Sequence, residues 1–468
     1  MLNVTTFGLL LVVIAVGYQY YYSKLEGGTD PVLRLATAWD HVLSNNTQWP
    51  QKIVLGVNAN LDLIVSATSL LRSLNETPGM GVDHSVLDTT KELQEQVSYS
   101  MQECAGTERY FSNKSLFDHI VQMAQTIPHT YFIGGNAALM AEKLITFIPT
   151  AEIYLVAPIG SQLKKLLNPQ LKIPRESLRV QDEIHVIMEY PSNEVWGKIT
   201  SPCANRVIHS HDVSNSQLSF LEPFKETILS SRPDLAILSG AHLLEATPQL
   251  FWEERIQEIA SLLHTVRTPV HFELATVGDL SFLRALLEGV IGNASSLGLN
   301  EQELLSLSKA AGVSSGMNVS KPEVSVVADL LHWLITTYGS ITGLSRVHLH
   351  TLTYHIVAEL IGGPWHYGEP AVVMGAKVAG LQACSVEMFD GKLFEVLLPS
   401  RFYLSREDLT LSKQMVQFSP SSPVVHWLRE GVRYYLSPVL VCKQPLKTVG
   451  LGDAISSTGL MYSMYSSK

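Results

Sequence analysis

The stretch KTVGLGDAISSTG, residues 447–459, places a carboxylate directly behind a glycine-rich turn. Gly450 and Gly452 let the backbone approach a ligand closely and take positive φ values. A helix that begins near Asp453 directs free N–H groups and its positive dipole end at an anion, so Gly450, Leu451 and Gly452 predict a backbone site for a phosphoryl group. Asp453 itself repels phosphate and therefore fits a base that takes a proton from an incoming hydroxyl. The alternative is that Asp453 only caps the helix.

Polar residues also follow short apolar runs that are typical of buried parallel strands. The runs lie at residues 53–57, 130–135, 151–160, 233–240, 268–275 and 346–352, and helix-like segments lie at residues 31–45, 136–147, 248–266 and 278–287. This alternation predicts an α/β fold with a mostly parallel sheet flanked by helices. Ligands bind such sheets beyond the carboxyl ends of the strands. The polar residues at those ends are Asn58, Asn60, Asp62, Gly134, Gly135, Asn136, His271 and Glu273.

Two regions do not follow this alternation of strands and helices. Residues 61–125 are more polar and less periodic, and residues 182–212 alternate in places with a period of two. The second pattern is typical of antiparallel strands. Together the two regions predict a small β-rich lid over the carboxyl edge of the main sheet.

The composition limits the kind of partner. With 468 residues and 46% hydrophobic residues, the chain is long and apolar enough for one large domain with an accessory domain. Its formal net charge is −10, and no run of lysine or arginine is present. Nucleic acid is therefore not expected as a partner. A site for phosphates must use a local positive charge.

The first residues predict entry into the secretory pathway. The apolar run from Phe7 to Gly17 has a length between that of a signal peptide and that of a spanning helix. We expect residues 1–28 to form an uncleaved signal anchor with a linker, and residues 29–468 to form the folded domain. The alternative is a buried first helix. This segment predicts a domain in the lumen of the endoplasmic reticulum or a later secretory compartment, or outside the cell. We expect the domain to be a monomer and to touch the membrane only through residues 1–28.

Sequons and cysteines agree with this compartment. N-x-[ST] triplets begin at Asn45, Asn75, Asn113, Asn293 and Asn318. Their pattern is that of N-glycosylation acceptors, although such triplets are common by chance. The cysteines Cys104, Cys203, Cys384 and Cys442 lack the spacing of a metal site. They predict either one disulfide or four buried thiols.

Four motifs together resemble one known family. They are GxGD at 450–453, HFE at 271–273, GGNA at 134–137 and NANLD at 58–62. In this order and spacing they resemble the ADP-dependent sugar kinases of the ribokinase-like superfamily. GxGD alone is a weak signal, whereas HxE followed by KTVGxGD is specific. The resemblance extends from about residue 50 to 460 and implies a ribokinase-like fold.

The resemblance implies roles for the acidic residues. Asp453 matches the general base, and Gly450, Leu451 and Gly452 match the backbone site for the transferred group. Glu273 matches a carboxylate that helps to hold Mg²⁺, and Glu301 and Asp453 are the further metal candidates. A solvated helix start is the alternative for Glu301. His271 either orients the same network or is a core histidine.

The resemblance also assigns the two substrates. Asp62 and Glu108, the latter from the lid, match carboxylates that bind sugar hydroxyls, and Gly134, Gly135 and Asn136 line the same end. Arg206 resembles an arginine that contacts the nucleotide phosphates, although it could equally pair with a local acid. The other nucleotide-binding candidates are His350, Thr351, His355, Thr448 and Val449.

The implied reaction is transfer of the β-phosphoryl of ADP to the 6-hydroxyl of glucose, giving glucose 6-phosphate and AMP. The chain has no GxxxxGK[ST] motif, which disfavours a P-loop enzyme. One rival is an ADP-dependent phosphofructokinase, but Glu108 suits an uncharged sugar better than a phosphorylated one. The other is an inactive membrane-anchored sugar-binding protein. The presence of both Asp453 and Glu273 argues against it.

Overall fold

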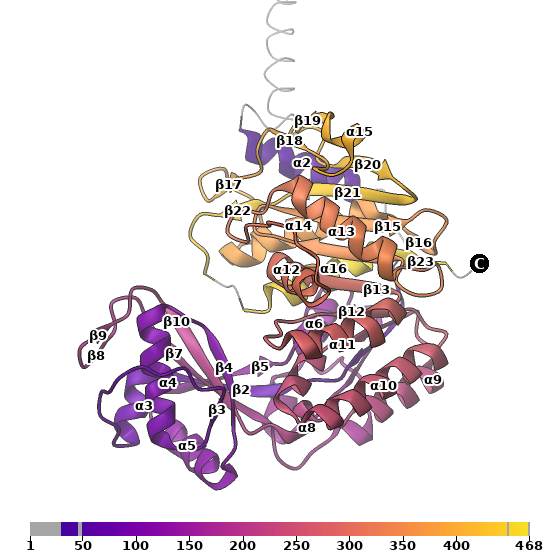
Figure 1. Cartoon of the computed structure of the whole chain (residues 1–468). Coiled ribbons are helices and arrows are strands. Elements are labelled where there is room, and N and C mark those ends of the chain that lie inside the picture. The colour runs from indigo at the N-terminus through magenta and orange to yellow at the C-terminus, as the bar shows by residue number, and fades with distance from the viewer. Residues whose placement is uncertain (1–29, 45–48, 447–448, 467–468) are drawn as a thin grey trace, which may run out of the picture. The chain divides into compact units, whose positions relative to one another are not determined.

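The computed structural model shows two compact units (Figure 1). The described residues are 30–44, 49–446 and 449–466. The contiguous unit comprises Gln51–Ala285, and the split unit combines Met1–Pro50 with Leu286–Lys468. The expected signal anchor at residues 1–28 lies outside the described residues, as does the sequon at Asn45.

Four parallel strands of the contiguous unit lie side by side. In sheet order they are β12 (Val270–Glu273), β11 (Leu235–Leu238), β1 (Lys52–Gly56) and β6 (Glu152–Val156). The strands are almost wholly buried, as expected for a sheet covered on both faces. The helices of this part are α6 (Asn136–Phe147), α7 (Ser161–Leu166), α8 (Val213–Ser216), α9 (Leu221–Ser231), α10 (Gln249–Thr265) and α11 (Leu280–Gly289). Both α6 and α9 pack against β1 and β6, which confirms the predicted βαβ pattern here.

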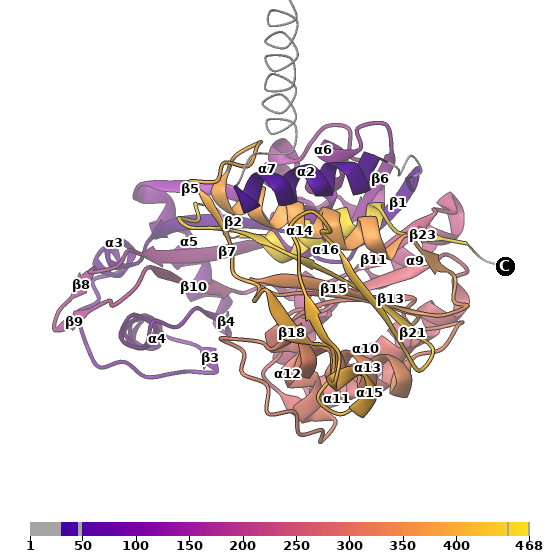
Figure 2. The same ribbon diagram turned by 90° about the horizontal axis from the view of Figure 1, so that it is seen from above.

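A second, six-stranded sheet belongs to the same unit (Figure 2). Its order is β3 (Val86–Leu87), β4 (Thr107–Phe111), β10 (Asn205–Ser210), β7 (Ile184–Tyr190), β2 (Asn60–Ser66) and β5 (His129–Gly134). It packs with α3 (Ala67–Ser73), α4 (Thr90–Glu103) and α5 (Lys114–Thr126) around its own apolar core. Most of these elements fall within residues 61–125 and 182–212, for which the role of a lid remains a prediction.

The placement predicted for the run at residues 130–135 was wrong. This run forms β5, which pairs antiparallel with β2 and is not part of the parallel sheet. β5 is a partly exposed edge strand, and Phe132 in its middle is 54% exposed. A short apolar run does not reveal whether one or both faces of its strand are covered.

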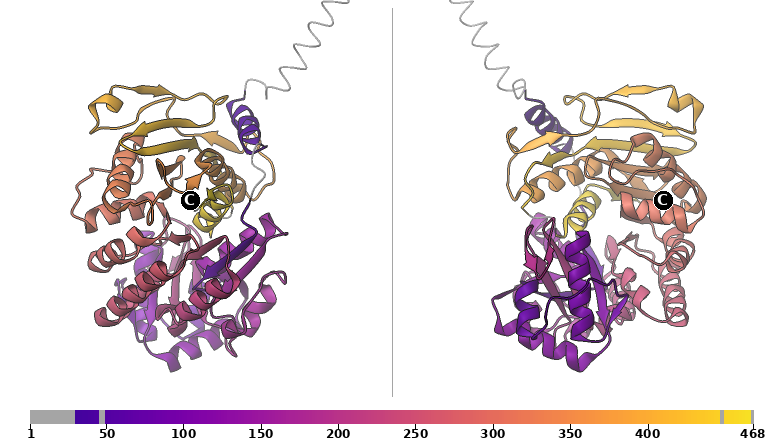
Figure 3. Two further views of the ribbon diagram at one scale, coloured as in Figure 1. Left: turned by 90° about the vertical axis from the view of Figure 1, so that its right-hand side faces the viewer. Right: turned by 60° about the vertical axis from the view of Figure 1, so that its left-hand side comes forward.

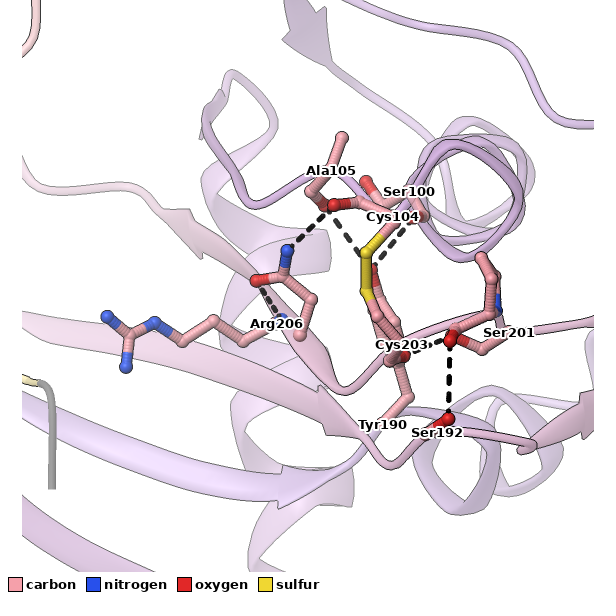
Figure 4. Close-up of a disulfide and its surroundings, with 10 residues drawn as sticks. Ser100, Cys104, Ala105, Tyr190, Ser192, Ser201, Cys203 and Arg206 are labelled. Carbon is pink, nitrogen blue, oxygen red and sulfur yellow. Dashed lines mark hydrogen bonds between the residues drawn. A yellow bond between two sulfur atoms is a disulfide. The ribbon is translucent and has the colours of Figure 1, made fainter. Parts of the chain in front are cut away.

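Two disulfides join all four cysteines, which differs from both alternatives expected from the sequence. Cys104, at the end of α4, bonds to Cys203, which lies before β10 (Figure 4). Around this bridge, the Tyr190 hydroxyl donates to Ser100 O at 2.8 Å, and Asn205 Nδ2 donates to Cys104 O at 3.0 Å. The second disulfide joins Cys384 to Cys442.

The split unit has a mixed set of strands. Their order is β13 (Ser296–Asn300), β14 (Arg346–His350), β15 (Tyr354–Leu360), β21 (Val432–Pro438) and β20 (Val425–Arg429). β13 and β14 are parallel, whereas the other pairs are antiparallel. The main helices are α2 (Pro31–Ser44), α12 (Glu301–Ala310), α13 (Val324–Tyr338), α14 (Gly368–Cys384) and α16 (Leu451–Met461). In Figure 3, α2 in indigo lies beside the yellow-orange antiparallel strands, and Trp39 Nε1 on α2 donates to Ser437 Oγ on β21 at 2.9 Å.

Short elements complete the two units. They are β8 (Val195–Trp196), β9 (Ile199–Thr200), β16 (Trp365–His366), β17 (Phe394–Val396), β18 (Arg401–Tyr403), α15 (Leu409–Ser412), β19 (Met415–Gln417), β22 (Leu440–Cys442) and β23 (Met464–Tyr465). Among the described residues, no helix combines the length and apolar character that crossing a membrane requires.

Candidate active site

The turn from β1 into β2 brings three of the predicted sugar-binding residues together. Asp62 on β2 is buried, and Asn60 Nδ2 donates to its Oδ1 at 2.6 Å. Gly134 pairs with Asn60 across the sheet, and a Cβ at Gly134 would overlap both polar side chains. Gly135 has φ +83°, and its Cβ would lie 2.6 Å from Ala59 Cα. The two glycines are therefore required for the close approach of β5 to the carboxylate.

Asn58 connects the turn between β1 and β2 to α6 and β11 by hydrogen bonds. Its Oδ1 accepts from Ala137 N at 3.1 Å and from the Ser239 hydroxyl at 3.1 Å, and its Nδ2 donates to Asn136 Oδ1 at 3.3 Å. Asn136 is the first residue of α6, and Ser239 follows β11. Asn58 and Asn136 thus belong to one hydrogen-bonded group, whereas Asn60 bonds with Asp62 and His271 with Glu273 in separate pairs.

His185 on β7 is a central member of the cluster that sequence reasoning missed. It is the register partner of Asp62 on β2. Its Nε2 lies 2.9 Å from Asp212 Oδ2, and its Nδ1 lies 3.7 Å from Glu108 Oε1. Burial alone would lower the pKa of His185, but the hydrogen bond and charge of Asp212, with the charges of Glu108 and Asp62, raise this pKa to about 9. The imidazole is therefore a cation at neutral pH.

Asp62 responds to the same surroundings. Burial raises the pKa of Asp62 to about 6, although His185, Asn60 and Arg206 oppose this rise. Glu108 adds to the rise through like-charge repulsion. The structure thus brings Asp62, Glu108 and Arg206 within electrostatic range of one another. The proximity of Arg206 to Asp62 gives this arginine a local acidic neighbour, and its assignment to the nucleotide remains a prediction.

The HxE motif at the end of β12 forms a buried pair. His271 Nε2 lies 2.9 Å from Glu273 Oε2, and both side chains are almost fully buried. The pairing agrees with the expectation that His271 orients the carboxylate. Glu273 is held in one position at the carboxyl end of a parallel strand, where ligands of α/β sheets bind.

In the split unit, the glycine-rich turn leads into α16. Gly450 is the N-cap with φ +64°, and Asp453 is the third residue of the helix, in its first turn. Asp453 is therefore not the N-cap residue, and its side chain is 7% exposed. Gly452 packs on β14, since a Cβ there would lie 3.2 Å from His350 Cε1. Val449 is described beside this turn, whereas Thr448 lies outside the described residues.

The start of α12 supplies acidic neighbours for Asp453. Asn300 and Glu303 form a capping box, in which Glu303 Oε2 accepts from Asn300 N at 2.8 Å. Burial raises the pKa of Glu303 to about 8, and the charges of Glu301 and Asp453 add to this rise. Glu303 was missed from the sequence, where the Asn300-to-Glu303 spacing was the available signal. Burial also raises the pKa of Glu301, so this residue is not a simple solvated helix start.

His350 ends β14, and Thr351 and His355 follow it; the three residues make different contacts. Burial lowers the pKa of His350 to about 4, so its ring is neutral. Thr351 Oγ1 donates to Tyr354 O at 2.8 Å and accepts from Tyr354 N at 3.1 Å. Thr351 thus stabilises the turn between β14 and β15. His355 is the register partner of His350, and their rings lie 6.0 Å apart.

Carboxylates are the ligands that Mg²⁺ prefers, and this ion keeps several of its own waters. Glu301, Glu303 and Asp453 in the split unit and Glu273 in the contiguous unit have the chemistry for such water-bridged contacts. No described group of three or more histidine, cysteine, aspartate and glutamate side chains is arranged to hold a metal ion by itself.

A family model, the ADP-specific phosphofructokinase/glucokinase conserved region, matches residues 51–462. The chain belongs to this family. An ADP-dependent glucokinase of Bos taurus is 39% identical over 448 residues, which cover 93% of this chain and 89% of the relative. A probable ADP-dependent glucokinase of Caenorhabditis elegans is 34% identical over 476 residues, which cover 97% and 94%. The resemblance to ADP-dependent sugar kinases is thereby confirmed.

Solved structures of the ADP-specific phosphofructokinase/glucokinase family confirm the fold. A hypothetical ADP-dependent phosphofructokinase from Pyrococcus horikoshii has a TM-score of 0.65 at 16% identity, covering 89% of this chain and 98% of that one. A complex of an ADP-dependent kinase with fructose-6-phosphate and ADPβS also has a TM-score of 0.65, over 93% and 98%. The predicted α/β ribokinase-like fold, with a large, mostly parallel sheet and a smaller second sheet, is correct.

Proposed function

We propose that this chain phosphorylates glucose with ADP, transferring the β-phosphoryl group to the 6-hydroxyl and releasing AMP and glucose 6-phosphate. The observation that carries this proposal is the 39% identity, over 93% of the chain, with the ADP-dependent glucokinase of Bos taurus. The acidic cluster around Asp62 supports it. Asp62, Glu108 and Asp212 favour an uncharged sugar over a sugar that already carries a phosphate.

Each residue of this cluster has a role in the proposal. Asp62 and Glu108 accept hydrogen bonds from sugar hydroxyls, while Gly134 and Gly135 let β5 pack closely beside Asn60 and Asp62. His185 acts as a positioning residue, because its contacts with Asp212 and Glu108 hold those carboxylates in place. Asn136 lines the same end through its bond to Asn58.

The phosphoryl end of the reaction is assigned to α16. Asp453 accepts the proton of the attacking hydroxyl, and the N–H groups of Gly450, Leu451 and Gly452 stabilise the charge on the transferred group. Glu301, Glu303 and Asp453 of the split unit would hold Mg²⁺ through water. Glu273 of the contiguous unit is a separate candidate for such a contact. The ion neutralises the charge of the phosphate oxygens when it is bound.

A coupled assay for glucose 6-phosphate tests the proposal. With glucose as acceptor, we expect ADP to support turnover at least about tenfold faster than ATP, and with ADP as donor, glucose to be used in preference to fructose 6-phosphate. Chelation of divalent cations should abolish turnover. Preference for fructose 6-phosphate would favour the phosphofructokinase alternative, and no turnover with any pair would favour the inactive sugar-binding protein.

The raised pKa of Asp62 predicts the acid limb of the pH profile. Only the ionised carboxylate accepts hydrogen bonds from two hydroxyls, and the pKa of about 6 means that protonation begins near neutrality. We expect kcat/KM for glucose to fall about tenfold per pH unit below about pH 6, because kcat/KM reports groups of the free enzyme. An ordinary aspartate would keep this value flat to about pH 4. A profile that is flat between pH 6 and pH 4.5 would contradict the assignment.

The cell location is part of the proposal. Disulfides persist in oxidising compartments; the Cys384–Cys442 pair of this chain is buried, and the Cys104–Cys203 pair is half-buried. Together with the apolar run in residues 1–28, they support a lumenal or secreted domain that is anchored by its first residues. We propose that the domain acts there as a monomer and that Asn75, Asn113, Asn293 and Asn318 are glycosylation acceptors.

A further inference from the structure

A cavity of about 220 Å³ lies in the split unit, away from the glycine-rich turn. Its lining residues are Glu359, Leu360, Ile361, Gly362, Gly363, Trp365, His366 and Arg433. Glu359 is the register partner of Arg346, the first residue of β14, whereas His350 is the last. Four residues of strand span about 13 Å. The cavity is thus at the opposite end of β14 from the nucleotide candidates His350 and Thr351.

The charge beside the cavity is positive on balance. Across three neighbouring strands, Arg346, Glu359 and Arg433 form one row, with the carboxylate between the two guanidinium groups. Glu359 is 3% exposed and Arg346 is fully buried. The Arg346 guanidinium also lies over the Trp365 ring, 5.5 Å from its centroid. Two cations and one anion leave an excess positive charge, which favours an anionic occupant.

Glu359 also requires a hydrogen-bond donor. Its Oε1 is buried and accepts no hydrogen bond from any described residue. Gly368, the first residue of α14, covers this oxygen, since a Cβ there would lie 2.9 Å from Oε1. A buried acceptor without a donor destabilises the folded state. A hydroxyl on the occupant would supply the missing donor.

The exposed wall of the cavity can supply the anion contact. Arg433 is exposed and bonds with Tyr435, which leaves other guanidinium N–H groups to face an anion. Trp365 and His366 also line the cavity. A volume below about 300 Å³ excludes drug-sized molecules and suits a small metabolite.

We propose that this cavity is a second ligand site, which binds a small anion that carries hydroxyl groups. Arg433 contacts the anionic group, and Oε1 of Glu359 accepts from a hydroxyl. Two sources share this chemistry, namely a sugar phosphate and a hydroxycarboxylate. The site is separate from the sugar-binding cluster of the contiguous unit and does not depend on the proposed reaction.

The cavity wall is connected to α16. β16, which contains Trp365 and His366, pairs with β23, and His366 Nε2 lies 2.9 Å from Ser466 Oγ. Ser466 N also donates to Pro364 O at 2.9 Å. β23 follows α16 after two residues, and α16 begins near Asp453. An occupant that contacts β16 is therefore one paired strand away from the segment that continues the helix of the proposed base.

Calorimetric titration with matched probes tests the proposal. Malate and succinate differ by one hydroxyl, and we expect malate to bind at least about tenfold more tightly, as for one hydrogen bond to a charged group. Glucose 6-phosphate is titrated into the Asp62→Ala variant, because the proposed sugar site of this variant is impaired. Glucose and inorganic phosphate are the controls, since each carries only part of the probe. Tighter binding of malate or of glucose 6-phosphate identifies the source. Equal binding of malate and succinate, with no saturable binding of glucose 6-phosphate, would overturn the proposal.

Two arginine variants locate the binding. Arg433→Ala should lower the affinity for the probe at least about tenfold, because a charge-assisted contact is lost. Arg401→Ala, a matched control at an exposed arginine of β18 outside the cavity, should leave the affinity unchanged. Both variants should keep the melting temperature of the wild type, since both arginines are exposed. Unchanged affinity in Arg433→Ala would place the probe elsewhere and contradict the proposal.

Discussion

Asp453→Asn is expected to lower kcat by about 10²–10⁴-fold, the usual contribution of a general base. The amide has the size of the carboxylate, so it fits the buried position in the first turn of α16. It removes the group that accepts the proton, together with the negative charge that the proposal also uses to hold Mg²⁺ through water. The N–H groups at the glycine-rich turn remain, and ADP binding should change little. Steady-state kinetics with saturating glucose and ADP measure the effect.

Asp40→Asn provides the matched control. Asp40 lies on α2 in the same unit, is well exposed and pairs with Lys377 on the surface. Surface pairs contribute little to stability, so this variant should match the wild type in kcat and in melting temperature. Nearly full activity in Asp453→Asn would show that Asp453 is not the base. A large loss of stability with normal turnover of the folded fraction would indicate a structural role instead.

Asp62→Ala is expected to lower kcat/KM for glucose by about 10²–10⁴-fold. Each hydrogen bond to a charged group contributes about 1.5–3 kcal/mol, and tenfold in affinity corresponds to about 1.4 kcal/mol. Loss of the two bonds that one carboxylate can accept gives this range. The KM for ADP should stay within about threefold, because Asp62 contacts only the sugar in the proposal. Varying each substrate at a fixed concentration of the other separates the two values.

Gly134→Ala and Asp118→Ala complete this experiment. A Cβ at Gly134 would overlap the Asp62 carboxylate, so Gly134→Ala should also weaken glucose binding without removing a charge. Asp118 lies on the surface of α5 and pairs with Lys114 four residues earlier. Its substitution should leave both KM values unchanged. A collapse of ADP affinity in Asp62→Ala, with normal use of glucose, would place Asp62 at the nucleotide end.

The sequence predicted best those elements whose signal is local. The helix expected at residues 136–147 has these bounds in the structure, because a glycine pair precedes it and its apolar face is regular. The runs at 53–57 and 233–240 form β1 and β11 for the same reason. The antiparallel strands β15, β21 and β20 were not predicted. Their pairing joins segments far apart in the sequence, and a buried strand has no alternation that reveals its direction.

The candidate site was predictable where a motif fixes the backbone. Gly134 and Gly450 stand where the backbone geometry requires glycine, and Asp453 follows Gly450 in the first turn of α16, so the motif is visible in the sequence. Glu303 was missed although its spacing from Asn300 is that of a capping box, and His185 was missed because it acts through a neighbour from another element. His185 reaches Asp212 from an adjacent strand, and only the folded sheet shows that the two side chains meet.

The split unit combines the first and the last parts of the chain, and this affects how it folds during translation. α2 packs against α14, and its Trp39 bonds to Ser437, which is 398 residues later in the chain. At about 5–20 residues per second, α2 leaves the ribosome roughly 20–80 s before its partner strand exists. The contiguous unit can complete its fold during this interval, whereas Leu35 and Trp39 have no apolar surface to cover them. Nascent chains should therefore carry an exposed, chaperone-binding helix until their last strands have been made.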